Sequence, residues 1–370
     1  MTRQPAVSGV KKQVLEMPAY TLRAYTAGIK LNQNENPWDM PAAIKAETLR
    51  RIEEREWSRY PEFVPASLIQ RLSEFSGWPS DGILVGNGSN ELIQAVLMVI
   101  VTEGKRVLIS EPTFTLYRQV ATVLGGEVVS VPLTAELNYD VKALTDAIQS
   151  LRPDVTIICS PNNPTGCAMD ERHLASILGV SDGLVVVDEA YHEFAGETAV
   201  PLLEHHQNLV VLRTFSKAMA MAALRVGYLL TSPVLAQEIS KALLPYNLNR
   251  FSQTAAEVAL EMYGSKLEPL VERINGQRDR LYSELRRIPG LAPMPTRANF
   301  ILVRSSIKPR LVFDELLKRD ILIRDVSGYP MLEDYFRIGV GTPEENEMLV
   351  SALREIFEGS ASHSVGVKSL

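Results

Sequence analysis

The chain has 370 residues, and its formal net charge of −6 gives no electrostatic support for binding nucleic acid. Its length is sufficient for two domains that share a large core, and its two cysteines indicate a reducing compartment, with neither a disulfide framework nor a zinc-binding spacing. The N-terminus has no apolar segment typical of a signal peptide, and the most apolar helix candidate, residues 92–101, is too short to span a bilayer, so we expect a cytoplasmic protein without a membrane anchor.

The start of the chain has weak periodicity, which predicts an arm that packs on another part of the protein, with Tyr20 and Tyr25 as aromatic contacts. Residues 30–37 form a polar run that ends in proline, and this turn chemistry excludes a core strand. A helix is expected over residues 41–56. Tyr60 then precedes a proline that holds it extended, and taken alone this tyrosine would be a packing residue.

Residues 83–91 predict a short strand, a glycine turn and the start of a helix that continues to residue 101. Ser89 or Asn90 is expected to cap this helix. Because a helix N-terminus offers free amide donors and the positive end of a dipole, the segment suits a phosphate group. The third glycine of the dinucleotide-binding pattern is absent, so that class of site is not indicated.

The next part of the chain alternates between apolar strands and helical periodicity, as in α/β domains. Phe114 follows one of these strands, where an aromatic residue usually belongs to the core. Residues 161–166 contain two prolines and a glycine, so a sharp loop carries Asn163 at the carboxyl end of a strand, where open α/β sheets bind ligands. The expected strands are 106–110, 127–133, 155–160 and 184–188, and the expected helices are 115–124 and 140–149.

The apolar strand 184–188 ends on Asp188, and a buried carboxylate requires a cationic partner. One interpretation is an ion pair with an arginine in the core. The other is a contact with the protonated ring nitrogen of a cofactor. The histidines at 192, 205 and 206 have no companion ligands at metal spacing, so no metal site is expected.

Lys217 and Arg225 lie between two predicted buried strands, residues 209–212 and 226–230. A lysine at the end of a buried strand loses hydration, which favours a neutral amine that can form a Schiff base with an aldehyde. The aldehyde cofactor pyridoxal phosphate also carries a phosphate, to which Ser216 and Arg225 can donate. The alternative, on spacing alone, is a surface lysine and arginine that flank an alanine-rich helix.

The last third of the chain predicts a smaller α+β domain after a long charged helical region over residues 257–288. Arg324 and Arg337 lie in or beside its β segments and need anions, either in scattered salt bridges or in a ligand. The C-terminal segment is rich in serine and glycine and is expected to be disordered. The predicted divisions are an arm at 1–38, a large domain at 39–265, a small domain at 266–358 and a tail at 359–370.

Several motifs resemble one family, the fold-type I pyridoxal-phosphate-dependent aminotransferases, and within it the histidinol-phosphate aminotransferases. The resemblance extends from residue 31 to residue 342. The chain departs from the family pattern at two places. Asn90 stands where aspartate is usual, and Met219, Ala220, Met221 and Ala223 replace a more common pattern of phenylalanine, glycine, leucine and glycine. The similar motifs are Asn34-Glu-Asn-Pro37, Arg59-Tyr-Pro61, Gly86-Asn-Gly-Ser-Asn-Glu91, Pro112-Thr-Phe114, Pro161-Asn-Asn-Pro-Thr-Gly166, Ser216-Lys217, Arg225-Val-Gly-Tyr228, Pro245-Tyr-Asn-Leu-Asn249 and Arg337-Ile-Gly-Val-Gly-Thr342.

The resemblance implies a role for each candidate residue. Lys217 is the lysine that forms the Schiff base, and it moves a proton between the substrate carbon and the cofactor. Asp188 contacts the ring nitrogen of the cofactor. Tyr191 and Asn163 lie at the ring oxygen, and Phe114 stacks on the ring. The implied phosphate-binding residues are Gly88, Ser89, Ser216, Arg225 and, reaching across a homodimer, Tyr60; Asn90 is implied as a further cofactor-binding residue. The implied substrate-binding residues are Tyr20, Asn36, Arg324 and Arg337, with Glu35 in the same loop.

The implied fold is a large α/β domain around a mostly parallel seven-stranded sheet, with a smaller α+β domain. The implied activity is transamination of L-histidinol phosphate with 2-oxoglutarate, which gives imidazole-acetol phosphate and glutamate in histidine biosynthesis. The implied partners are these small molecules and a second copy of the chain, which shares its active sites; no nucleic acid or membrane is involved. Three alternatives stay open: an aromatic aminotransferase, a threonine-phosphate-type decarboxylase and a non-catalytic cofactor-binding protein. The intact Lys217, Asp188 and Tyr191 argue against the last.

Overall fold

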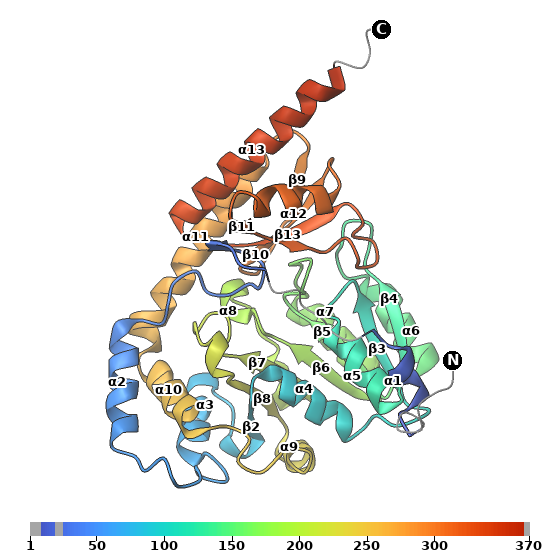
Figure 1. Ribbon diagram of the computed structural model, residues 1–370. Helices are drawn as coiled ribbons and strands as arrows, with labels where there is room; N and C mark the ends of the chain where they lie inside the picture. Colours follow the sequence, from blue (N-terminus) through green and yellow to red (C-terminus); the bar gives the residue numbers. More distant parts are fainter. Residues whose placement is uncertain (1–8, 19–24, 366–370) are drawn as a thin grey trace.

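A computed structural model describes residues 9–18 and 25–365 of the chain, with the side chains of residues 360–365 left aside. The chain forms a large α/β domain, at the bottom of Figure 1, and a smaller α+β domain above it. Within the described residues, no helix has both the length and the apolar character needed to cross a membrane. The predicted fold class is therefore confirmed, whereas the exact residue at which the domains divide stays a prediction.

The large domain is built on a seven-stranded sheet with the order β2-β8-β7-β6-β5-β3-β4. The five strands from β7 to β4 run parallel, and β8 is antiparallel to both of its neighbours. Every residue of the central strands β5 to β8 is buried, as expected for apolar, β-branched runs covered on both faces. The strands are β2 (Ile83–Gly86), β3 (Arg106–Glu111), β4 (Glu127–Pro132), β5 (Val155–Cys159), β6 (Leu184–Asp188), β7 (Leu209–Thr214) and β8 (Gly227–Thr231).

Helices cover both faces of this sheet, because alternate strand residues point to opposite sides. Val185 and Val187 pack in the core with one set of helices, and Val186 packs with the other set. The first set contains α2 (Ala42–Glu53), α3 (Ala66–Ser76), α6 (Val141–Leu151), α7 (Glu171–Val180) and α10 (Arg250–Glu261). The second contains α4 (Ser89–Met98), α5 (Leu116–Leu124) and α9 (Pro233–Ser240), while α1 (Lys12–Glu16) and α8 (His192–Ala195) are short.

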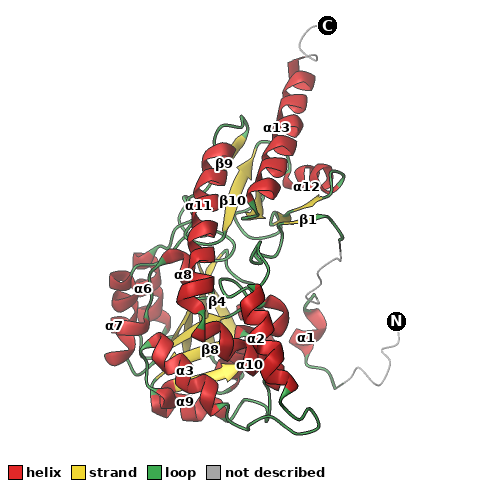
Figure 2. Cartoon of the chain, turned by 90° about the vertical axis from the view of Figure 1, so that its left-hand side faces the viewer, coloured by secondary structure: helices red, strands yellow, loops and turns green. Residues whose placement is uncertain are grey.

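The small domain combines the end of the chain with a piece of its start. Its four-stranded sheet has the order β12-β13-β10-β9, and β1 (Ile29–Lys30) pairs in parallel with β11 (Ile321–Leu322) beside it. The remaining strands are β9 (Leu291–Pro293), β10 (Phe300–Ser305), β12 (Arg324–Asp325) and β13 (Tyr335–Gly339), and the helices are α12 (Pro309–Leu317) and α13 (Pro343–Val365). Figure 2 shows α11 (Glu268–Leu285) rising from the large domain into the small one.

The charged region 257–288 is largely helical, as predicted, and a π-helical turn, Tyr263–Leu267, separates α10 from α11 within it. One prediction about the end of the chain needs correction. At the C-terminus, α13 continues to Val365, so residues 359–365 are helical where disorder was predicted. No proline interrupts this segment, and the periodic residues before it, including Leu349 and Leu353, anchor the helix in the small-domain core.

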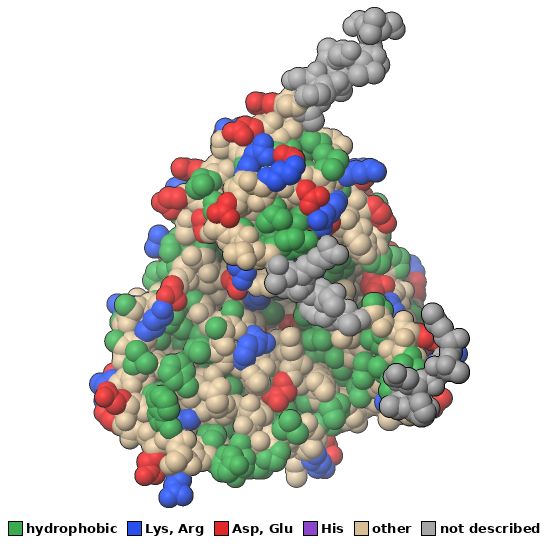
Figure 3. Space-filling model, viewed as in Figure 1, with side chains coloured by type: hydrophobic (Ala, Val, Ile, Leu, Met, Phe, Trp, Pro, Cys, Tyr) green, Lys and Arg blue, Asp and Glu red, His purple; other side chains and the backbone are tan. Residues whose placement is uncertain are grey.

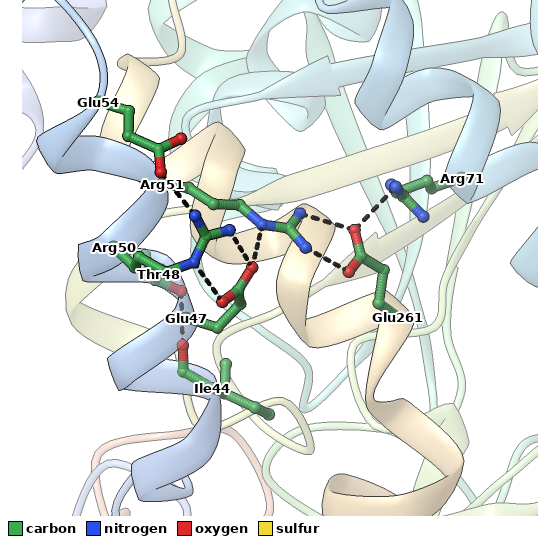
Figure 4. A network of polar contacts seen from close by, with 8 residues as sticks. All are labelled: Ile44, Glu47, Thr48, Arg50, Arg51, Glu54, Arg71 and Glu261. Atoms are coloured by element: carbon green, nitrogen blue, oxygen red, sulfur yellow. Dashed lines mark hydrogen bonds and ion pairs between the residues drawn. The ribbon is translucent and has the colours of Figure 1, made fainter.

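An ion-pair network joins α2 to α10 and α3 on the large domain (Figure 4). The Arg51 guanidinium donates two hydrogen bonds of 2.7 Å to the Glu261 carboxylate, which also pairs with Arg71. Glu47 accepts from Arg50 and Arg51, and these arginines lower its pKa to about 2. The network fixes α2 on α10 immediately before the loop that carries Tyr60.

Candidate active site

A cavity of about 210 Å³ lies at the carboxyl ends of the parallel strands, between the large and small domains. Figure 3 shows a hollow between the two parts of the molecule on this face. The sequence-predicted residues that line the cavity are Ser89, Asn90, Phe114, Asn163, Asp188, Tyr191, Ser216, Lys217, Arg225, Arg324 and Arg337. Strand ends converge here because each parallel strand delivers its next loop to the same edge of the sheet.

Lys217 follows β7 and extends into the cavity, where its Nζ donates to the carbonyl oxygen of Gln33 at 2.9 Å. Burial, followed by the positive charge of Arg337, lowers the pKa of this amine to about 8. At pH 7 roughly one amine in ten is then neutral, far more than for an ordinary lysine, and this neutral form is the nucleophile. The alternative of a surface lysine beside an alanine-rich helix is excluded, since residues 222–224 form only a single 3₁₀ turn.

Asp188 ends β6, and both of its carboxylate oxygens accept hydrogen bonds. The Tyr117 hydroxyl donates to Oδ2 at 2.7 Å and the Ala190 amide donates to Oδ1 at 3.1 Å. Burial raises the pKa of Asp188, while these donors oppose the shift. Within the described part of the chain, Asp188 forms no ion pair; the core ion pair belongs to its neighbour Glu189, which binds Arg213 at 2.9 Å. A buried carboxylate on a cavity wall without a cation suits a cationic ring nitrogen.

The N-terminus of α4 contributes Ser89 and Asn90 to the cavity lining. The helix begins at Ser89 with Gly88 as N-cap, and no side chain caps it, so the predicted capping by Ser89 or Asn90 is wrong. Both residues lie inside the first turn, where their own amides remain available to an anion. Gly88 has a φ of 80°, and a Cβ there would lie 2.4 Å from the Arg225 guanidinium. Glycine therefore allows Arg225 to lie against the helix start.

Ser216 and Arg225 complete an anion-binding corner with this helix. Arg225 Nη1 donates to Ser216 Oγ at 3.1 Å. Arg225 itself has a φ of 54°, which turns the chain sharply between the 3₁₀ turn and β8. A guanidinium, a hydroxyl and free helix amides in one corner provide the donor set that a phosphate group requires.

The loop before α2 also lines the cavity. Asn34 Nδ2 donates to the Tyr191 hydroxyl at 3.0 Å. Arg337 on β13 donates to Asn163 Oδ1 and, at 2.9 Å, to the carbonyl oxygen of Asn32. One strand of the small domain is thereby tied both to the Asn163 loop and to the start of the chain.

Four predicted residues are not brought into this cavity. Gly88 is not among the residues that line it, and Tyr60 is 78% exposed on a separate surface groove. Asn36 donates to the Ala218 carbonyl oxygen at 3.2 Å and lines a neighbouring cavity. Glu35 pairs with Lys30 and also belongs to that neighbouring cavity. Tyr20 lies outside the described residues.

Sequence reasoning missed several residues that line the cavity: Asn32, Gln33, Asn34, Tyr117 and Tyr329. The polar run at 30–37 signalled its importance, but only the folded loop shows that Gln33 and Asn34, rather than Asn36, face Lys217 and Tyr191. Tyr117 looks like a core residue of an amphipathic helix, and no local pattern marks its hydroxyl.

Comparison with known proteins gives a consistent result. The sequence model of the family "Aminotransferase class I and II" matches residues 26–353. A histidinol-phosphate aminotransferase of Chlorobium phaeovibrioides is 37% identical over 348 residues, which is 94% of this chain and 96% of the relative.

Solved structures agree with this comparison. The histidinol-phosphate aminotransferase of Sinorhizobium meliloti, in complex with pyridoxal-5'-phosphate, superposes with a TM-score of 0.83 at 25% identity, covering 90% of this chain and 92% of that one. The enzyme of Clostridium acetobutylicum superposes with a TM-score of 0.82 at 26% identity, covering 90% and 99%.

Proposed function

The chain belongs to the class I and II aminotransferase family and uses pyridoxal phosphate as its cofactor, and on this premise we propose that its substrates are L-histidinol phosphate and 2-oxoglutarate. The products would be imidazole-acetol phosphate and glutamate, in a step of histidine biosynthesis. The observation that carries the proposal is the pair Arg324 and Arg337, which are Cα partners on β12 and β13 and line the same cavity as Lys217.

The cavity residues fit the cofactor. Pyridoxal phosphate supplies an electron sink for the carbon that bears the transferred amine. Asp188 would hold the protonated ring nitrogen, and Phe114 would cover one face of the ring. The corner formed by Ser216, Arg225 and the start of α4 would hold the phosphate, which leaves Lys217 to bind the aldehyde carbon.

Lys217 would move the proton that transamination requires. Its Nζ lies 5.9 Å from the centre of the Tyr191 ring and is held by the Gln33 carbonyl, so it borders the space that the reacting carbon would occupy. With its pKa lowered to about 8, the amine can accept a proton from the substrate's amine-bearing carbon near neutral pH. Tyr191, fixed by Asn34, borders the same space.

The two arginines provide charge for a phosphate on the substrate. Histidinol phosphate has no carboxylate, so an arginine that binds the carboxylate of 2-oxoglutarate would bind phosphate in the other half-reaction. A phosphate dianion can accept two guanidinium forks. The Arg324 side chain forms no hydrogen bond or ion pair with any described residue, so its charge is available at the cavity, whereas Arg337 is already oriented by Asn163 and Asn32.

We also propose a homodimer in which Tyr60 reaches the partner's cofactor phosphate. A surface patch near Tyr60 supports it: Trp57 is 80% exposed and Phe63 65% exposed, and the Tyr60 ring stacks on Tyr246 at 4.6 Å. An exposed aromatic patch of this kind marks an interaction surface. Arg250 also donates to the Tyr60 carbonyl oxygen at 3.0 Å, which holds the loop in place.

The substrate assignment is tested by mixing the purified, cofactor-loaded protein with histidinol phosphate and 2-oxoglutarate and measuring glutamate. We expect kcat/KM to be much higher for histidinol phosphate than for phenylalanine or tyrosine. A preference for the aromatic amino acids would favour the aromatic-aminotransferase alternative. Release of carbon dioxide from threonine phosphate, without glutamate formation, would favour the decarboxylase.

A further inference from the structure

We propose that Tyr117 is a positioning residue for the cofactor ring: its hydroxyl holds the Asp188 carboxylate that receives the ring nitrogen, and its ring supports Phe114. The inference rests on pyridoxal phosphate as cofactor and is independent of the substrate. It therefore stands or falls separately from the assignment of histidinol phosphate.

Two hydrogen bonds orient the Asp188 carboxylate. Tyr117 lies on α5 and has no exposed surface, and Asp188 is 3% exposed. The tyrosine hydroxyl donates to Oδ2 at 2.7 Å, while the Ala190 amide donates to Oδ1 at 3.1 Å. Helix α5 thus holds one carboxylate oxygen and the turn after β6 holds the other, which fixes the plane of the carboxylate on the cavity wall.

Tyr117 also contacts Phe114. The rings of Tyr117 and Phe114 meet edge to face, with centroids 5.6 Å apart and planes at 87°. The Tyr117 amide also donates to the Phe114 carbonyl oxygen at 3.3 Å. The buried Tyr117 side chain therefore contacts both Phe114, which would cover the face of the cofactor ring, and Asp188, which would hold the ring nitrogen.

Electrostatics agrees with this arrangement. Burial and the adjacent carboxylate raise the pKa of Tyr117 well above its usual value, so the hydroxyl remains a donor. Burial raises the pKa of Asp188, and the Tyr117 hydrogen bond is the largest influence that lowers it. Glu189 opposes ionisation of Asp188 but is paired with Arg213. The other titratable groups whose charges couple to Asp188 are Cys159, Tyr139 and Tyr191, and each has a raised pKa.

The test measures the dissociation constant of pyridoxal phosphate as a function of pH, with Lys217→Ala as the parent so that Schiff-base formation does not contribute. Tyr117→Phe keeps the ring and its contact with Phe114 but removes the hydroxyl. Since hydrogen bonds to charged groups contribute about 1.5–3 kcal/mol, we expect roughly 10- to 100-fold weaker binding. The pKa of Asp188 should rise in the variant. As the pH is lowered, cofactor affinity should therefore begin to fall at a higher pH than in the parent.

Tyr228→Phe is the matched control. Tyr228 is 1% exposed, and its hydroxyl lies 3.4 Å from Arg213 Nη1, away from the cavity lining. This substitution also removes one buried hydroxyl, but cofactor affinity and its pH dependence should not change. An equal loss in both variants would show a general effect of core damage and overturn the proposal.

A double-mutant cycle with Asp188→Asn separates positioning from simple stabilisation. If Tyr117 acts through Asp188, Tyr117→Phe weakens binding much less in the Asp188→Asn background than in the parent. Additive losses would overturn the proposal. Tyr117→Phe could fail to fold because it leaves the buried Asp188 carboxylate without its hydrogen-bond donor. In that case, adding Asp188→Asn should restore folding, measured by circular dichroism. A folding failure that Asp188→Asn does not correct would also overturn the proposal.

Discussion

Arg324 on β12 and Arg337 on β13 are Cα partners in an antiparallel pair, and both line the cavity that contains Lys217. Arg337 is 7% exposed and held by Asn163 and Asn32, so its guanidinium is oriented before any ligand binds. Arg324 is only partly buried and has no such contact among the described residues. The two cations therefore differ in rigidity, which leads to different expectations for their removal.

We expect Arg324→Ala to raise the KM for histidinol phosphate far more than the KM for 2-oxoglutarate. Arg337→Ala should impair both half-reactions, because the dicarboxylate also needs this cation. Losing one partner of a buried charge pair costs about 2–5 kcal/mol in binding. Steady-state kinetics with each substrate varied in turn measures the effects. An equal effect of Arg324→Ala on both substrates, or none, would place phosphate recognition elsewhere.

Lys217→Ala should abolish turnover but leave a folded protein that still binds pyridoxal phosphate non-covalently. The reason is that Lys217 supplies the amine, whereas Asp188 and the Arg225 corner hold the rest of the cofactor. Borohydride reduction of the unsubstituted protein, followed by peptide mapping, should label Lys217. A label on any other lysine would contradict the assignment.

The pKa of Lys217, about 8, should move in opposite directions when two of its charged neighbours, Arg337 and Glu35, are removed one at a time. Arg337 lowers this pKa and Glu35 raises it. Arg337→Ala should therefore shift the rate of pyridoxal-phosphate capture by the cofactor-free protein to higher pH, and Glu35→Gln should shift it to lower pH. Arg354→Ala, which removes a guanidinium paired with Glu284, serves as control. Shifts of the same sign in both variants would contradict the electrostatic account.

Asp188→Ala and Glu189→Gln should separate chemistry from stability at adjacent positions. Asp188→Ala should bind the cofactor but lose about 100-fold or more in kcat, because the ring nitrogen loses its charged partner. Glu189→Gln strands the buried Arg213 and should cost about 3–5 kcal/mol in the free energy of unfolding, with cofactor chemistry retained. Near-normal turnover of Asp188→Ala would make Asp188 a structural residue.

Glu193 should make the protein less stable as the pH rises. Burial raises its pKa to about 8, and the pKa of the adjacent His192 is lowered, so this histidine supplies no charge. Between pH 4.5 and 8 the folded state holds a proton that the unfolded state has lost, so this carboxyl group destabilises by at most about 1.4 kcal/mol per pH unit. Glu193→Gln should thus gain stability over the parent from pH 5 to pH 8 in urea titrations. A difference that does not depend on pH would refute this.

The sequence by itself determined the elements that carry the chemistry. Apolar, β-branched runs ended at Asp188 and just before Lys217, so the burial of both groups followed from local pattern. The loop with Asn163 and the glycine turn before α4 were likewise recognisable, because turns and helix starts depend on residues close together in the chain. The βα alternation was sufficient to indicate an α/β domain.

Only the tertiary structure decided which side chains meet. Tyr117 and Asp188 are 71 residues apart, Asn34 and Tyr191 are 157 apart, and Arg337 and Asn163 are 174 apart. Periodicity reports which face of an element is apolar but not which hydroxyl or amide on another element lies opposite. The absence of a side-chain cap on α4 has the same origin, since Gly88 is fixed there by the close approach of Arg225, a residue from a different part of the chain.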